Sequence, residues 1–442
     1  MTRPRIAVVG GGLAGLVAAD RLLGNGFPVT LFEKWPEAGG LVGTLDVGGT
    51  PLERFYHHLF TSDVDYVDFA REFGLEKEID WLPSKMGFYT EGRLWDFGTP
   101  ASLLKFSPLG FSGRLQLVLS TLRLRHNPDW KALEGETAAG WLKKNGYGKV
   151  YDVVWGPLLH QKYGRAAEEI GLVWLWGKIF LRTRSRDKTG LGERLGYMRG
   201  SFGRGVAAVL SRVKERGGDV RTARPVRIVK RGPDGTFEVT SSGGTESFDL
   251  VLSTIAIPEL LKIAADLPEE TRKAWSEVRY AHALCPVMEL DRSFQRYYWT
   301  NIADVSMPFG GVIEHTNFIP KETYGGRHVL YLSDYVLSDD PKWTMKDESL
   351  WGLYLPALAR LNPRFEAAWI LRKTIERAEY AQPIIPANYS RILPPIETPV
   401  PGLYSACMAQ IYPEDRGQNY AVRIGRQAAD LLAARSRAAR KA

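Results

Sequence analysis

The stretch Arg5-Ile-Ala-Val-Val-Gly10-Gly-Gly12-Leu-Ala-Gly15-Leu-Val-Ala-Ala-Asp20 decides the fold of the N-terminal part of this chain. Branched apolar residues predict a strand up to Val9, and Gly10, Gly12 and Gly15 predict a turn leading into a helix. The glycines suit a tight turn, close approach of the backbone to a pyrophosphate, and close packing of helix on strand. The amides at the start of the helix, at Leu13 and Ala14, would bind the diphosphate. The pattern therefore predicts a dinucleotide-binding βαβ unit.

The second strand of this unit is predicted over residues 28–33, Pro28-Val-Thr-Leu-Phe-Glu33. Glu33 follows the glycines by about twenty positions, where this fold places a carboxylate that accepts hydrogen bonds from the adenosine ribose. A glycine triplet also occurs in ordinary turns, but here strand, spacing, helix and terminal acid agree. Glu33 is therefore the predicted ribose ligand.

A second glycine cluster follows at once, in Glu33-Lys34-Trp-Pro-Glu-Ala-Gly-Gly40-Leu41-Val42-Gly-Thr44. This continuation resembles the extended N-terminal motif of the FAD-dependent amine oxidase superfamily. That superfamily includes protoporphyrinogen oxidases, phytoene-type desaturases and, more distantly, UDP-galactopyranose mutases. In these families the second cluster lies along the flavin diphosphate and ring. The resemblance implies non-covalently bound FAD, with Lys34, Gly40, Leu41 and Val42 among its contacts.

Later segments extend the resemblance over most of the chain. After a glycine patch at 196–203, a helix and a strand lead to Val226, whose counterpart in the superfamily packs its backbone on the adenine. The strand 248–254 resembles the one that re-enters the main sheet, and it brings Ser253 to the cofactor.

The segment 401–429 resembles the second flavin contact of the superfamily. The resemblance implies that Asp415 reaches the ribityl chain and that backbone at Asn419, Tyr420 and Ala421 faces the isoalloxazine carbonyl. The families usually show Gly-Glu or Gly-Asn after the preceding strand, whereas this chain reads Ala406-Cys-Met-Ala.

The resemblance implies an α/β fold, with a Rossmann-like FAD-binding domain and a discontinuous α+β substrate domain. The length of 442 residues also exceeds what one hydrophobic core usually organises. We expect an FAD-binding domain at 1–75, 191–261 and 391–434, a substrate-binding domain at 76–190 and 262–390, and a flexible basic tail at 435–442.

Composition excludes several classes of protein. Cys285 and Cys407 lie far apart and without metal-type spacing, so neither a disulfide framework nor a metal site is expected, and Cys407 is expected to be a free thiol. The N-terminus lacks the profile of a secretory signal, which predicts a cytoplasmic protein. No run of about 18 uncharged apolar residues predicts a spanning helix. No nucleic-acid-binding module is visible, so the expected partner is a small-molecule substrate. Oligomeric state is left open.

Two regions allow two interpretations each. Leu115, Val118, Leu119 and Leu122 recur at helical spacing between arginines. They either pack in a core or form a membrane-contacting face, similar to that of protoporphyrinogen oxidases, on the inner side of the membrane. The sequence pI near 9.2 permits the second interpretation.

The other region is basic, with cations that outnumber Asp187 and Glu193. It is either a solvated face or a site for diphosphate, polyprenyl phosphate, tetrapyrrole carboxylate or lipid headgroups. Its cations are Lys178, Arg182, Arg184, Arg186, Lys188, Arg194, Arg199 and Arg204.

Two segments supply candidate catalytic residues. The stretch Glu53-Arg-Phe-Tyr-His57-His58-Leu-Phe-Thr-Ser-Asp63 resembles the Gly-x-His-x-Phe-x-Thr-Ser of UDP-galactopyranose mutases. We predict that His58 lies at the flavin ring and either polarises flavin N5 or carries a substrate proton, with a purely structural role for either histidine as the alternative. The segment 155–164 resembles a Pro-Leu-Leu-x-x-Lys-Phe-Gly stretch of bacterial oxidoreductases and offers Lys162, together with His160, to the pocket.

The leading functional prediction is an FAD-dependent oxidoreductase. It would transfer a hydride from a hydrophobic, anionic substrate of isoprenoid or tetrapyrrole type to flavin N5. One alternative is a flavin-dependent non-redox isomerase of a nucleotide sugar, resembling UDP-galactopyranose mutase. Another is a flavin-binding module without catalysis.

Overall fold

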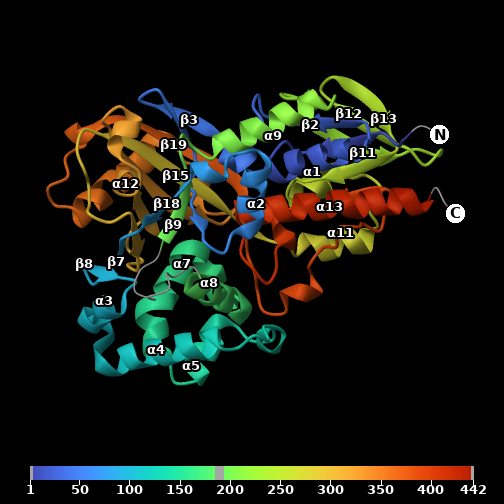
Figure 1. Ribbon diagram of the computed structural model, residues 1–442. Coiled ribbons are helices and arrows are strands. Elements are labelled where there is room, and N and C mark those ends of the chain that lie inside the picture. Colours follow the sequence, from blue (N-terminus) through green and yellow to red (C-terminus); the bar gives the residue numbers. More distant parts are fainter. Residues whose placement is uncertain (1–2, 185–193, 440–442) are drawn as a thin grey trace.

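The computed structural model describes residues 3–184 and 194–439, arranged as two sheet-containing parts above a group of helices (Figure 1). A parallel sheet in strand order β10-β2-β1-β14-β20 carries the glycine-rich turn. Three distant stretches of sequence meet in it. Its strands are β1 (Ile6–Val9), β2 (Val29–Phe32), β10 (Asp219–Arg221), β14 (Leu250–Ser253) and β20 (Leu403–Ser405).

Both faces of this sheet are covered, which explains the unbroken apolar run of β1. Ile6 and Val8 share a core with the helices α1 (Leu13–Gly24), α9 (Gly203–Glu215) and α13 (Gln418–Ala439). Ala7 and Val9 point the other way. They meet the antiparallel sheet of β11 (Val226–Arg231), β12 (Phe237–Ser241) and β13 (Gly244–Phe248), and the helices α10 (Ile257–Ile263) and α11 (Glu269–Ser276).

The second part is a mixed sheet in the order β19-β15-β18-β17-β16-β7-β8. All of β15 is buried, because sheet neighbours flank it and α12 (Asp347–Leu361) covers one face. The strands are β7 (Met86–Thr90), β8 (Arg93–Phe97), β15 (Tyr280–Leu290), β16 (Trp299–Ile302), β17 (Gly311–Glu314), β18 (His328–Val336) and β19 (Ile370–Pro383).

Smaller elements join the two sheets. A hairpin of β3 (Thr44–Val47) and β4 (Thr50–Glu53) precedes a three-stranded sheet of β5 (Leu59–Phe60), β9 (Arg194–Met198) and β6 (Ile79–Pro83), beside α2 (Val64–Glu72).

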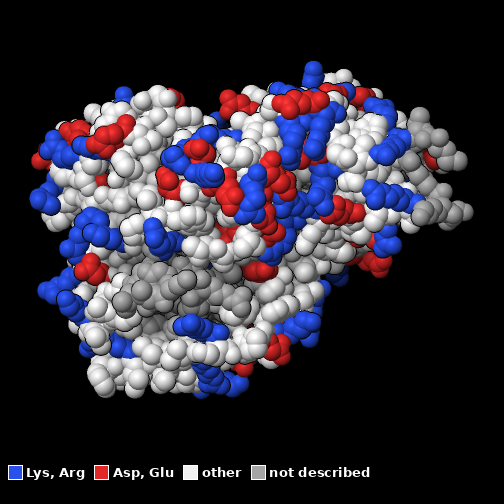
Figure 2. Space-filling view, in the orientation of Figure 1, with Lys and Arg blue, Asp and Glu red and all other residues white. Residues whose placement is uncertain are grey.

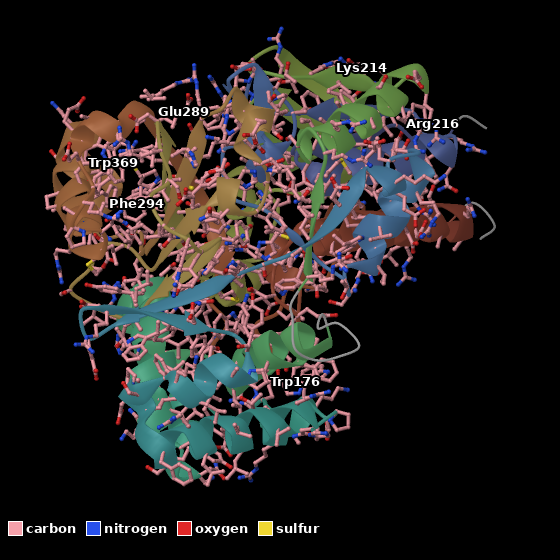
Figure 3. All side chains as sticks on the ribbon, turned by 60° about the vertical axis from the view of Figure 1, so that its left-hand side comes forward. Trp176, Lys214, Arg216, Glu289, Phe294 and Trp369 are labelled. Carbon is pink, nitrogen blue, oxygen red and sulfur yellow. The ribbon has the colours of Figure 1, made fainter. Side chains whose placement is uncertain are left out.

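The remaining helices, within residues 100–184, form what we call the helical module. Figure 1 shows it below both sheets, and Figure 3 shows Trp176 within it. Its core combines aliphatic side chains with several aromatic ones, among them Trp141, Tyr163 and Trp174. Its helices are α3 (Pro100–Lys105), α4 (Gly110–Arg125), α5 (Ala138–Lys144), α6 (Gly148–Val150), α7 (Gly156–Tyr163) and α8 (Leu172–Arg184), with a π-helical turn at Tyr151–Trp155.

Helix α4 does not bury its predicted apolar face, so the core-packing interpretation is wrong there. Leu115, Val118, Leu119 and Leu122 are between 40% and 51% exposed. The helix packs instead through the opposite side, which carries Gly113, Ser120 and Leu124. Small side chains on that side allow close contact with α6 and α8, and the larger ones are left at the surface.

The C-terminal helix α13 runs to Ala439, so residues 435–439 are helical where a flexible tail was expected. Arg435 donates to Glu397 at 2.8 Å, and Arg437 donates to Asn25 at 2.7 Å, which anchors this last turn. Within the described residues, no helix combines the length and the apolar character needed to cross a bilayer.

Candidate functional site

The glycine-rich turn ends β1 and opens α1 with free amides. Gly10 has φ +110°, and a Cβ on Gly15 would lie 1.9 Å from the Gly10 carbonyl oxygen, so both positions require glycine. The first bond of the helix is donated by Leu16 to Gly12 at 3.0 Å. The amides of Leu13 and Ala14 therefore have no acceptor inside the helix, and no acidic side chain occupies its first turn. Such a helix end attracts anions.

The two glycine clusters lie against each other. Gly39 donates its amide to the Gly11 carbonyl at 2.8 Å, and Gly12 pairs with Gly39 in an isolated bridge. Gly40 has φ +58°, and a Cβ there would lie 3.1 Å from the Gly12 Cα atom. Val42 is buried behind this contact. The two glycine runs, 10–15 and 39–43, thus form one backbone surface at the carboxyl end of β1, which we call the glycine surface. Larger side chains at these positions would obstruct it.

Glu33 follows β2 and lies beside this surface, where its carboxylate contacts the glycine-rich turn. Its Oε2 accepts the amide of Gly11 at 2.7 Å, and its Oε1 accepts the amide of Trp35 at 2.9 Å. A carboxylate has about four lone-pair sites, so acceptor capacity remains for hydroxyl groups. The amide of Arg224 donates to the Glu33 carbonyl at 2.8 Å, which brings the half-buried Val226 to this end. Lys34 is exposed, with Nζ 5.4 Å from the Trp35 ring.

The N-terminus of α13 lies on the same side of the parallel sheet. Gln418 is buried, yet neither its Nε2 nor its Oε1 has a hydrogen-bond partner among the described residues. Asn419 accepts the amide of Tyr66 at 3.0 Å, and Tyr420 and Ala421 begin the helix behind it. A Cβ on Gly425 would lie 2.5 Å from the Ala14 carbonyl oxygen, so α13 crosses α1 at the diphosphate end.

The Ser253 hydroxyl ends β14 on this edge and, within residues 3–184 and 194–439, is likewise buried without a partner. An orphaned amide, an orphaned hydroxyl and a glycine surface fit a polar dinucleotide such as FAD.

The two histidines of the 53–63 segment differ in their surroundings. His58 Nδ1 lies 3.1 Å from the Tyr298 hydroxyl, and its ring packs edge-on against Phe60. His57 Nδ1 lies 2.6 Å from the Phe55 carbonyl, which only accepts, so Nδ1 carries the hydrogen and Nε2 presents a lone pair. Burial, with a smaller contribution from the nearby Arg416 charge, lowers the pKa of His57 to about 4, although the bond to the Phe55 carbonyl opposes this shift. His57 is therefore neutral at pH 7. No contact among the described residues tests the catalytic role of His58, which stays a prediction.

Charged residues from three elements meet around Asp415. Lys178 of α8 forms an ion pair with its carboxylate, and Gln382 of β19 donates to Asp415 Oδ1 at 3.1 Å. Burial alone would raise the pKa of Asp415, but the charges of Lys178, Lys162 and Arg416 outweigh burial and hold that pKa below its usual range. We call Lys162, Lys178 and Arg416 the cation cluster.

The cation cluster reaches the glycine surface through aromatic and small side chains. Lys162 Nζ lies 5.4 Å from the Tyr335 ring centroid, and Arg416 donates a hydrogen bond to the Tyr335 hydroxyl. Tyr335 also packs, with Leu41 and Phe55, against what we call the alanine cluster, formed by Ala283, Ala378 and Ala381. Lys162 and Asp415, predicted from separate motifs, thus come together beside Leu41.

The described cations of the predicted basic region do not gather at one site. Lys178 joins Asp415, whereas Arg194 donates to the Trp81 carbonyl at 2.7 Å. Arg199 lies 3.4 Å from Asp80, and Arg204 lies 3.2 Å from Glu78, in surface ion pairs. Arg186 and Lys188 lie outside the described residues, as do the side chains of Arg182 and Arg184.

Sequence reasoning missed Gln382, Tyr335 and the role of Arg416. The first two lie on β19 and β18, and only the pairing of those strands with β15 decides which way they point. Arg416 follows Asp415 in the quoted loop, but nothing in its spacing indicated a partner on β18.

Three solved structures share this architecture. A candidate protoporphyrinogen oxidase from Exiguobacterium sp. 255-15 superposes with a TM-score of 0.78 at 18% identity, over 98% of this chain and 100% of that one. Reduced UDP-galactopyranose mutase gives 0.74 at 17% identity, over 97% and 95%. Cyclohexylamine oxidase from Brevibacterium oxydans IH-35A gives 0.70 at 16% identity, over 98% and 99%. These identities are low enough that the likeness shows the fold alone.

No functionally curated protein matches the sequence. The model of the flavin-containing amine oxidoreductases, however, matches residues 13–433, from the first turn of α1 almost to the end of α13. FAD is the cofactor of these enzymes, and the glycine surface, Glu33 and Gln418 fit it. The chain therefore belongs to the flavin-containing amine oxidoreductase family and is an FAD-dependent oxidoreductase.

Proposed function

We propose that this enzyme oxidises a hydrophobic substrate that carries an anionic group, of the isoprenoid or tetrapyrrole type. The observation that carries the proposal is the junction at Tyr335, where the apolar alanine cluster meets the cation cluster beside Leu41. Apolar surface favours the hydrocarbon part of such a substrate, and buried cations favour its charged end. When bound, FAD accepts the hydride at flavin N5.

The cofactor would lie along the glycine surface. The amides of Leu13 and Ala14, with the bare backbone of Gly12 and Gly40, suit its diphosphate. Glu33 suits the ribose hydroxyls, with Lys34 and the Val226 backbone at the adenine end. The orphaned groups of Gln418 and Ser253, and the backbone of 419–421, suit the polar edge of the flavin.

A local distortion of β19 shapes the substrate side. Tyr380 adopts φ +51°, unusual for a bulky residue, and its amide donates to His282 Nδ1 at 3.0 Å. The register of β15 and β19 shifts here, between Ala281 and Ala283. This bulge places Ala381 in the alanine cluster and the next residue, Gln382, against Asp415.

His57 is proposed to accept a hydrogen bond from the substrate. Its Nε2 lone pair has no partner among the described residues, and the Phe55 carbonyl fixes the tautomer through Nδ1. Because its pKa is about 4, the ring accepts a hydrogen bond from an N–H or O–H group of the substrate at neutral pH. His58 is proposed to hold this segment through Tyr298, and Lys162 to bind the substrate anion.

The visible spectrum of the purified protein tests this function. Oxidised-flavin bands that leave with the filtrate after denaturation show non-covalent FAD. Anaerobic mixing with polyprenyl or tetrapyrrole acids should bleach these bands, because a substrate that donates a hydride reduces the flavin. If instead only dithionite-reduced protein acts, and it interconverts the ring forms of a nucleotide sugar, the protein is an isomerase and the oxidoreductase proposal fails.

We also propose that α4 docks on an anionic membrane surface. Phe111 is 83% exposed and lies on the same face as Leu115, Val118, Leu119 and Leu122. Contiguous exposed apolar side chains mark contact sites. Residues 97–128 include four basic residues and no acidic one, and Figure 2 shows a mainly uncharged and basic surface where Figure 1 places α4 and α5. Apolar side chains between cations suit an anionic lipid interface.

Flotation with vesicles tests this docking. We expect the protein to float with anionic vesicles and to lose this behaviour in the variant Phe111→Ser/Leu115→Ser. Leu353→Ser on α12, a leucine that is 41% exposed and far from α4, is the control and should float like the wild type. A wild-type protein that ignores vesicles but forms dimers broken by the double substitution would show instead that the face contacts a second copy.

A further inference from the structure

Two hydrogen-bond donors are buried without acceptors beside the cation cluster. The Tyr163 hydroxyl and the Trp174 indole N–H have no partner among the described residues, and both side chains are buried. Their rings meet edge to face with centroids 5.6 Å apart. A buried unsatisfied donor costs about 1–3 kcal/mol, and native proteins keep few of them. Two adjacent ones indicate a place built for an acceptor that comes from outside the chain.

Positive charge surrounds the same place. Lys162 Nζ lies 5.3 Å, and Lys178 Nζ 5.4 Å, from the centroid of the Trp174 ring. Burial raises the pKa of Tyr163 well above its usual range, and the charges of Asp415 and Arg416 also act on it, so its hydroxyl lies near both. The described part of the chain thus gathers three cations around one carboxylate here. Lys162 and Lys178 are both partly buried, and cations in such a setting attract anions more strongly than fully exposed ones do.

We propose that Lys162, Lys178, the Tyr163 hydroxyl and the Trp174 N–H bind an oxyanion of the substrate, a carboxylate or a phosphate. This proposal rests on the proposed function, because it assigns the charged end of the substrate to this cluster. All four groups donate hydrogen bonds, so only an acceptor satisfies them, and charge-assisted bonds to an oxyanion are about twice as strong as neutral ones.

The surrounding contacts hold this site in shape before the anion arrives. Asp415 pairs with Lys178 and reduces the repulsion between neighbouring cations. Gln382 fixes both Asp415 and Arg416, and Arg416 in turn binds Tyr335, which contacts Leu41 through the alanine cluster. A substrate anchored here therefore extends its apolar part over the alanine cluster towards Leu41.

The test uses FAD-saturated protein, so that the diphosphate site is filled, with inorganic phosphate and acetate as separate probes. We expect one of them, added at constant ionic strength, to raise Tm and to change the tryptophan fluorescence. The probe that acts identifies the class of oxyanion. Lys162→Met and Lys178→Met should weaken this response at least tenfold. Lys144→Met, an exposed lysine of the same module that pairs with Glu136 at 3.5 Å, is the matched control and should respond like the wild type.

Tyr163→Phe separates binding from folding. Removing an orphaned hydroxyl should leave Tm without anion unchanged or higher, while the anion response weakens about fivefold. This variant keeps the proposal falsifiable if either lysine variant fails to fold.

The proposal is overturned if neither probe changes Tm or fluorescence, or if Lys178→Met and Tyr163→Phe respond like the wild type. In that case bound FAD and its reduction by a substrate still support the proposed function. Conversely, an anion response in a protein whose flavin no substrate reduces supports the site and contradicts the proposed oxidation.

Discussion

Gln382 Nε2 donates a hydrogen bond to Asp415 Oδ1 over 3.1 Å, from a side chain that is itself buried. The Oε1 atom of the same amide accepts a bond from Arg416 at 2.9 Å. One amide thus holds a partly buried anion and a partly buried cation in place, and the proposed substrate site depends on a residue that need not touch substrate.

Gln382→Leu should lower the free energy of unfolding by about 2–4 kcal/mol. The leucine has a similar volume but leaves Asp415 and Arg416 each short of a buried hydrogen bond. Urea unfolding followed by circular dichroism measures the change. An unchanged urea midpoint would show that the two charged groups find other partners.

Gln418→Leu, unlike Gln382→Leu, should not destabilise the cofactor-free protein. Because neither amide atom has a partner among the described residues, its loss should leave the stability of the cofactor-free protein unchanged or slightly higher. FAD affinity, measured by flavin fluorescence on titration, should fall about tenfold. A variant that binds FAD as tightly as the wild type would remove Gln418 from the cofactor site.

Gly40→Ala should abolish or strongly weaken FAD binding. The new Cβ would lie 3.1 Å from the Gly12 Cα atom and would separate the two glycine clusters. The matched control is Gly74→Ala, where φ is +70° and a Cβ meets nothing within 4 Å. Both substitutions cost about 1 kcal/mol of backbone strain, and only Gly40→Ala adds the close contact with Gly12. We therefore expect a loss of FAD affinity in Gly40→Ala and none in Gly74→Ala. Equal FAD affinities would contradict the role given to the Gly12–Gly40 contact.

Glu314 should make the protein less stable as pH rises. Burial raises its pKa from 4.5 to about 7, although the amides of Phe294 and Gln295 donate to it. The unfolded chain therefore ionises first. The contribution of this carboxyl is complete below pH 4.5 and is lost as pH rises through about 7. Glu314→Gln should remove about 1–3 kcal/mol of this dependence, measured by urea unfolding at pH 5 and pH 8. Parallel pH profiles for the two proteins would show that Glu314 is already ionised.

Local patterns in the sequence were enough for the N-terminal βαβ unit, whereas the later strands of the same sheet were predicted from the family resemblance. Glycine spacing and a terminal acid act over about thirty residues, so the βαβ unit and its contacts follow from short-range geometry. The contact between Gly12 and Gly40 also lies within this range.

The substrate half depended on long-range pairing. The positions of Gln382 and Ala381 follow from a bulge at Tyr380. Tyrosine is not a residue type that indicates such a bulge in a sequence. Helical spacing in α4 identified an apolar face but not whether other parts of the chain cover it. Arg435 was predicted to begin a flexible tail, but it is helical and binds Glu397, which is distant in sequence.

The place of β20 and α13 in the parallel sheet has a consequence for biosynthesis. β20 and α13 are translated after the other strands of that sheet. During synthesis the edge of β14 that later pairs with β20 is therefore unpaired, and α1 lacks the helix that crosses it at Ala14. The nascent chain therefore holds the glycine surface before it holds Gln418. A chain that lacks α13 should therefore bind FAD more weakly than the full chain, because it lacks Gln418 and the helix that crosses α1.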